Sequence, residues 1–78
     1  MTNIQFCSIV LLNLADQFGS REICKRNDML IQRILLERKL YANQDDVSPV
    51  LLMVSAWLSE LMDNEYHEHM EESYKQSR

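Results

Sequence analysis

Two histidines near the C-terminus, His67 and His69, are the residues whose type first suggests metal chemistry. Imidazole is the commonest protein ligand for transition metals. On an α-helix, however, residues two positions apart point about 200° away from each other, so the two rings cannot hold one ion together. The chain also lacks the H-E-x-x-H and E-x-x-H spacings that place metal ligands on one helix face. We therefore predict no metal site and no cofactor.

The two cysteines, Cys7 and Cys24, are the other candidates for chemistry, as a redox pair. They form no C-x-x-C motif, and both fall at apolar helical positions, which favours small buried hydrophobic residues instead. The single glycine, Gly19, cannot make a phosphate-binding loop, and no residue lies in a nucleophile motif. We predict a protein that is not an enzyme.

The number of cysteines and the first apolar run indicate the cellular compartment. Two cysteines in 78 residues do not make the disulfide framework of a small secreted domain. The first apolar run is preceded by no basic residue and is interrupted by Ser8, Asn13 and Asp16, which fits neither a signal peptide nor a transmembrane span. We expect a cytoplasmic protein with no transmembrane segment.

One glycine and one proline are too few for several hairpins, while 46% of the residues are hydrophobic, so the composition predicts an all-α fold. Thr2 and Gln5 have the spacing of a capping box, which predicts a helix from residue 3 to 18 that ends at Gly19. A second helical segment spans 21–42, with Ser20 as its N-cap. Asn27 and the aspartate after it can split this segment in two, so three or four helices are expected.

Ser48 and Pro49 form the N-cap and first position expected of a third helix, which continues at least to Met62. We predict one helical domain over residues 1–70. The remaining residues, 71–78, are polar and acidic and are predicted to fray as a tail.

The first two helical segments are predicted to be apolar on more than one side. In the first, Ile4, Cys7, Leu11, Leu14 and Phe18 make one stripe, with further apolar residues away from it. A small monomer buries about one face of each helix, so we expect a homodimer that shares its core. The residues assigned to self-association are those off the main stripes: Phe6, Ile9, Leu12, Met29, Leu36 and Leu40.

Charge is divided unevenly along the chain. Residues 21–41 hold six basic and three acidic side chains, whereas residues 59–78 hold six acidic and two basic ones. The basic segment suggests nucleic-acid binding through Arg21, Lys25 and Arg33 as an alternative function. The net charge of −4 and the spread of the basic residues around the helix make this alternative the weaker one, so nucleic acid is an unlikely partner.

The acidic end of the chain suggests a surface for a protein partner. Tyr66, Met70 and Tyr74 recur every four residues along one side of a charged helix, with Glu65 and Glu68 beside them. Aromatic and methionine side chains within a charged surround are common in recognition surfaces. We therefore predict a regulator or inhibitor that occupies the surface of another protein, as small accessory proteins of phages and plasmids do.

Overall fold

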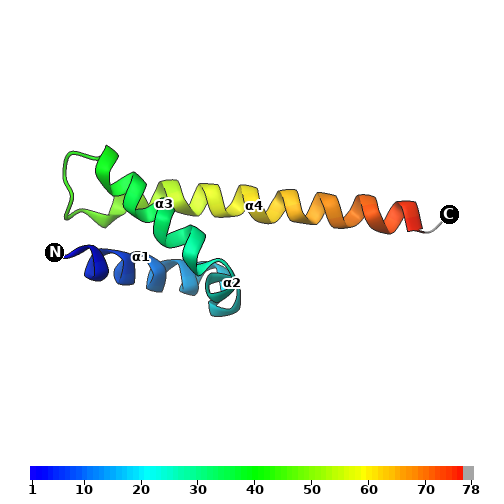
Figure 1. Ribbon diagram of the computed structural model, residues 1–78, viewed down its shortest axis with the longest axis horizontal. Coiled ribbons are helices and arrows are strands. Elements are labelled where there is room, and N and C mark those ends of the chain that lie inside the picture. The colour runs from blue at the N-terminus through cyan, green and yellow to red at the C-terminus, as the bar shows by residue number, and fades with distance from the viewer. Residues whose placement is uncertain (77–78) are drawn as a thin grey trace.

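The computed structural model describes the backbone of residues 1–76 and the side chains of residues 1–66. The chain is all-α: 85% of its 78 residues are helical, and the described part contains no strands. Four helices follow one another (Figure 1): α1 (Asn3–Phe18), α2 (Ser20–Lys25), α3 (Asn27–Leu40) and α4 (Val47–Gln76). The predicted small helical bundle is confirmed, with the second segment split in two.

α1, α3 and α4 pack together into the bundle, and α2 is a short connection at one end (Figure 1). α4 runs out beyond the other helices, so the molecule measures 54 × 22 × 18 Å. With 30 residues, α4 is about 45 Å long, well beyond the length that α1 and α3 cover. The predicted boundary between a domain at 1–70 and a tail at 71–78 stays a prediction.

Both ends of α1 follow from its sequence. The Thr2 hydroxyl accepts a hydrogen bond from the backbone N–H of Gln5 at 3.2 Å, and the Gln5 side-chain oxygen accepts one from the Thr2 N–H at 3.0 Å. This reciprocal capping box satisfies two N–H groups that the helix leaves open. At the other end Gly19 has a φ of 92°, a conformation that glycine adopts without a Cβ clash. Both predicted ends of this helix are confirmed.

Three other helix ends differ from the prediction. Ser20 is the first residue of α2 and makes no side-chain cap, because Gly19 serves as the boundary of both α1 and α2. The break in the second segment falls at Arg26, one residue before Asn27. α4 begins at Val47, since the Asp46 carboxylate accepts a hydrogen bond from the Ser48 N–H at 3.0 Å, so the prediction of Ser48 as N-cap was wrong.

Fully buried side chains from three helices make the core. They are Phe6, Val10 and Leu14 from α1, Leu30 and Ile34 from α3, and Val50, Val54 and Leu58 from α4. The buried stripe of α1 is therefore rotated from the predicted one: Ile4 is 79% exposed, and Leu11 is only half-buried. The prediction that Phe6 serves self-association was wrong, because its ring is closed off in the core of a single chain.

Candidate interaction surface

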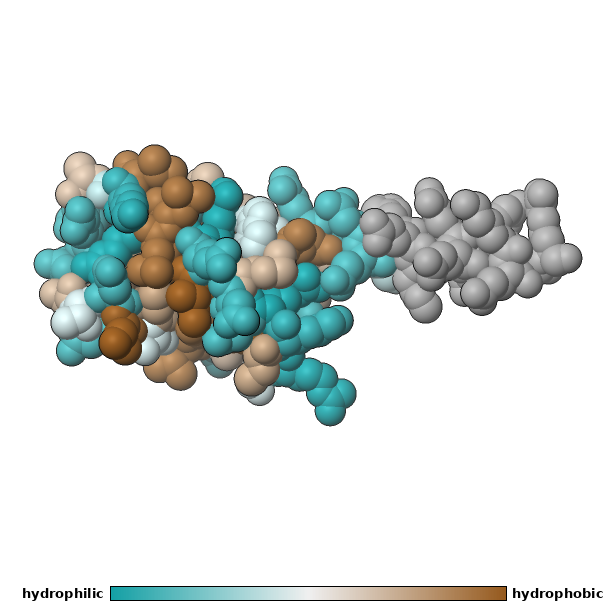
Figure 2. All heavy atoms as spheres, in the orientation of Figure 1, coloured by the Kyte–Doolittle hydropathy of each residue, from teal (hydrophilic) through white to brown (hydrophobic). Residues whose placement is uncertain are grey.

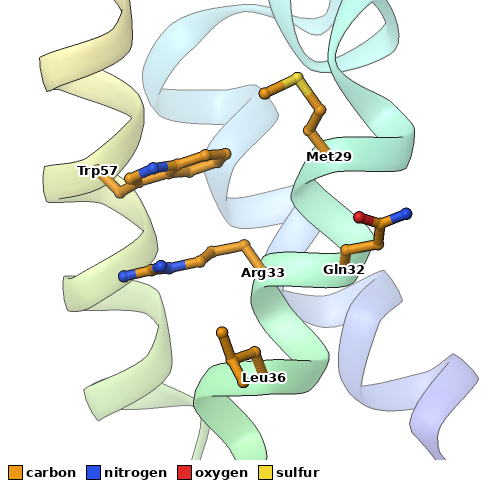
Figure 3. Close-up of a pocket in the computed structure, with 5 residues that line it drawn as sticks. All are labelled: Met29, Gln32, Arg33, Leu36 and Trp57. Atoms are coloured by element: carbon orange, nitrogen blue, oxygen red, sulfur yellow. The ribbon is translucent and has the colours of Figure 1, made fainter.

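A shallow, mostly apolar groove lies between α3 and α4. Met29, Gln32, Arg33 and Leu36 line it from α3, and Trp57 lines it from α4. In Figure 3 the Arg33 and Trp57 side chains reach toward each other across the groove, with Met29 above them and Leu36 below. We call these five residues the α3–α4 groove.

The groove is centred on a stacked pair. The guanidinium carbon of Arg33 lies 5.6 Å from the centroid of the Trp57 ring, within the range of a cation–π contact. Trp57 is partly buried and packs against the core. The stack therefore places an aromatic ring and a cation side by side between α3 and α4.

Apolar side chains continue the groove on both of its walls. Along α3, Met29, Leu36 and Leu40 lie on one side of the helix at i, i+7 and i+11, and all three are about half exposed or more. On α4, Met53 lies one turn before Trp57 and is also exposed. At the end of the molecule away from the projecting part of α4, hydrophobic side chains gather in a band (Figure 2). In the same view of the ribbon, α3 lies in front there (Figure 1). Such contiguous apolar patches mark interaction sites more often than single exposed leucines do.

A charged pair underlies the groove. Arg33 Nη2 lies 2.8 Å from Glu37 Oε1, and Glu37 is only 4% exposed. Removal of the Arg33 charge would leave the buried Glu37 carboxylate without its partner. The Nε atom of Arg33 is buried and has no hydrogen-bond acceptor within the described residues. This donor is enclosed by the chain itself, so it is not part of the accessible surface of the groove.

Arg38, which is buried, joins the start of α1 to the end of α3. Its Nη1 donates to Asn3 Oδ1 and its Nη2 to the Met1 carbonyl oxygen, both at 2.8 Å. Its guanidinium carbon lies 4.5 Å from the centroid of the Phe6 ring. Burial raises the pKa of the neighbouring Cys7 thiol, and the charge of Arg38 partly offsets this. A raised pKa keeps this thiol protonated and unreactive at neutral pH, while Cys24 is exposed.

Arg26, at the break between α2 and α3, ties α2 to α4. Its guanidinium forms ion pairs with Glu65 of α4 and, at 3.3 Å, with Glu22 of α2. The hydrogen bond from Arg26 is the main reason why the pKa of Glu65 lies below its ordinary value. Glu65, predicted as a partner-binding residue, therefore makes a contact within its own chain.

The other predicted site residues lie in separate parts of the surface. Leu12 and Ile9 lie on the outer side of α1, far in sequence from the groove, while Met29 and Leu36 line the groove itself. The basic residues are separated too. Arg21 and Lys25 are exposed on α2, whereas Arg33 is committed to Glu37 and Trp57. The spacing of Trp57 on α4 is that of a core stripe, and the ring does pack against the core, but no local pattern in the sequence indicates that Arg33 stacks on it.

The predicted contacts at the acidic end are described only in part. Tyr66 is largely exposed, but Glu68, Met70 and Tyr74 lie outside the residues whose side chains the structure describes, as do His67 and His69. Within the described residues no three His, Cys, Asp or Glu side chains come close enough to hold a metal ion. In the same part of the chain, no helix combines the length and the apolar character that crossing a membrane requires.

No protein-family model matches the chain, and no curated protein or solved structure matches it either. What the chain binds therefore has to be inferred from its own surfaces.

Proposed function

We propose that this chain is a non-enzymatic protein that binds another protein through the α3–α4 groove and regulates or inhibits it by occupying its surface. The observation that carries the proposal is the stacked pair of Arg33 and Trp57 between two exposed apolar walls. Tryptophan, arginine and methionine are enriched at the centres of protein interfaces, and few such residues carry most of the binding energy.

The groove favours a partner that presents an apolar helix face. The exposed residues of α3 recur at helical spacing along one side, which suits a helix laid beside them. The Arg33 side chain is 33% exposed, so an acceptor on that partner, such as a carboxylate, would approach its guanidinium at the groove.

We further propose that the chain self-associates and that it is located in the cytoplasm. Leu12, Ile4 and Leu40 are exposed in a single chain, which supports contact with a further copy. Both cysteines are free thiols, as is usual in a reducing compartment. The acidic-end residues Tyr66, Met70 and Tyr74 remain a predicted extension of the partner contact.

The groove is tested with a double substitution, Met29→Ser with Leu36→Ser, against Leu52→Ser as the matched control. All three side chains are exposed, but Leu52 lies outside the groove. Affinity-tagged chains are recovered from the native host, and bound proteins are quantified by mass spectrometry. We expect a partner that the control retains and the groove variant loses, with binding of the purified pair at least about tenfold weaker in titration calorimetry.

Retention of every bound protein by the groove variant would contradict the proposal. Nucleic-acid binding, the competing prediction, is tested in parallel with Arg21→Ala and Lys25→Ala, two exposed residues one turn apart on α2. A salt-sensitive gel shift that this variant alone abolishes would favour that alternative.

A further inference from the structure

We propose that the outer face of α1 binds a second copy of this chain, with the two α1 helices antiparallel and the two Ser8 residues at the centre of the contact. This outer face consists of Ile4, Ser8, Ile9 and Leu12. The inference rests on the self-association proposed above and assigns it to one surface, separate from the α3–α4 groove. α1 lies along one edge of the bundle in Figure 1, where none of the other three helices covers this face.

The apolar residues of this face are symmetric about Ser8. Ile4 lies four residues before it and Leu12 four residues after it, so all three share one side of the helix. Their side chains are among the most exposed large hydrophobic ones in the described part of the chain, with Ile4 79% and Leu12 71% exposed. In an antiparallel pair centred on Ser8, Ile4 of each copy faces Leu12 of the other.

A hollow is available to receive the partner's side chain. Met1, Ile4, Gln5, Ser8 and Ile9 line a mostly apolar depression beside the small Ser8 side chain. Leu12 projects from the same helix two turns further on and is open to solvent. In the antiparallel arrangement, Leu12 of each copy would lie at this depression of the other copy, so the same contact is made twice. A knob and a hollow on one face make the face complementary to itself, as a two-fold interface requires.

The electrostatics of α1 favour a copy of itself as the occupant. Residues 1–15 contain no charged side chain, and Asp16 is the first. In an antiparallel pair centred on Ser8, the residues between Ile4 and Leu12 of one copy face the same stretch of the other, and none of them has a charged side chain, so this contact brings no like charges together. A membrane surface is the less suitable occupant, because helices that lie on membranes carry basic residues on their polar side, and α1 has none.

The Ser8 hydroxyl at the centre of this face and the Asn13 amide next to Leu12 both donate a hydrogen bond within α1. The Ser8 hydroxyl donates to the Ile4 carbonyl oxygen at 2.8 Å, and the Asn13 side-chain amide donates to the Ile9 carbonyl oxygen at 2.8 Å. Burial between two helices would therefore leave neither of these two donors without a partner. A small residue at the centre also lets the two backbones approach closely.

The contact is expected to be weak. α1 has 16 residues and is about 24 Å long, so one helix face supplies less than the roughly 800 Å² per partner of a standard interface. We therefore expect a dimer that dissociates in the micromolar range, and one that a single substitution at Leu12 disrupts.

The register is tested by disulfide cross-linking in a Cys24→Ser background, in which the remaining Cys7 is buried. Ser8→Cys is expected to form a covalent dimer under mild oxidation, because the two positions face each other across the two-fold axis. Asp16→Cys is the control. Antiparallel helices centred on Ser8 hold the two copies of position 16 about 24 Å apart, too far for a disulfide. Efficient cross-linking at position 16, or none at position 8, would overturn the proposed geometry.

The surface is tested by comparing Leu12→Glu with Leu52→Glu, since both leucines are 71% exposed but Leu52 lies on α4. We expect the dimer dissociation constant from light scattering to rise at least about tenfold for Leu12→Glu and to stay unchanged for Leu52→Glu. Circular dichroism confirms that both variants are folded.

The outcomes separate the surface from the self-association itself. A dimer that persists in Leu12→Glu overturns the surface while self-association stands. A wild-type chain that is monomeric at all concentrations overturns both. A membrane is the other occupant to test, by sedimentation with phosphatidylcholine–phosphatidylglycerol vesicles. If the wild type forms no dimer but binds vesicles, and Leu12→Glu abolishes that binding, the face is a membrane-binding surface instead.

Discussion

The outer face of α1 and the α3–α4 groove are both exposed apolar surfaces, but they differ in chemistry. The face of α1 is uncharged and mainly aliphatic, and the Ser8 and Asn13 side chains already donate hydrogen bonds within the helix. The groove contains an aromatic ring, a paired arginine and a buried donor without an acceptor. We propose that the first suits an identical face and that the second suits a different protein. An excess of apolar residues in a sequence can thus conceal two different kinds of binding surface.

The comparison depends on a core that holds both surfaces in place, and the largest expected effect tests that core. Leu14 is fully buried between the helices, whereas Leu11 on the same helix is half-buried. Leu14→Ala should lower the free energy of unfolding by about 2–5 kcal/mol, and Leu11→Ala by clearly less. Urea denaturation followed by circular dichroism measures both. Equal losses would contradict the assignment of the core stripe to Phe6, Val10 and Leu14.

The charged pair beneath the groove should give the next largest effect. Arg33→Ala removes the partner of the buried Glu37 carboxylate and the cover of Trp57. We expect a loss of about 1–3 kcal/mol in the free energy of unfolding, the usual cost of a buried polar group left unpaired. Arg21→Ala, on the exposed surface of α2, is the control and should change it little. A loss no larger than the control's would show that the groove is not held by this pair.

The ion pair between Arg26 and Glu65 should give a smaller, pH-dependent effect. Because Arg26 lowers the pKa of Glu65 below its ordinary value of 4.5, the stabilisation is fully present above pH 4.5 and is lost as the pH falls through the lowered pKa. Glu65→Gln should therefore melt at a lower temperature than the wild type at pH 7. The difference should vanish in strong acid. A difference in melting temperature that stays constant from pH 7 to pH 2 would contradict this role.

The smallest effects on stability are expected from the two surfaces themselves. Leu12→Ser on α1 and Leu36→Ser in the groove remove exposed side chains, so each should change the free energy of unfolding of the monomer by no more than about 0.5 kcal/mol. Chemical denaturation at concentrations below dimer formation measures this. A large loss for either variant would show that its side chain packs within a single chain and is not available for binding.

Local signals predicted the fold well. The Thr2–Gln5 capping box and the lone Gly19 set both ends of α1 because each acts within a few residues of the chain. The start of α4 was misplaced because Asp46 and Ser48 are both good capping residues, and only the folded chain shows which one accepts the hydrogen bond.

The candidate surfaces were predicted less well, for a physical reason. The spacing of Ile4 and Phe6 allows either to face the core, and the packing of α3 and α4 decides in favour of Phe6. The partners of Arg38 lie 35 and 37 residues away, so no local pattern reveals its burial. Leu12, Met29 and Leu36, which the spacing puts off the main stripes, are exposed, and their role in self-association stays a prediction.

Sedimentation equilibrium of the intact chain, from about 1 to 200 micromolar, tests the central claim most directly: that one chain exposes more apolar surface than it needs to fold. We predict a mass that rises with concentration from 9.3 kDa toward twice that value. A mass that stays at 9.3 kDa over the whole range would contradict the claim, because the outer face of α1 would then be ordinary solvated surface.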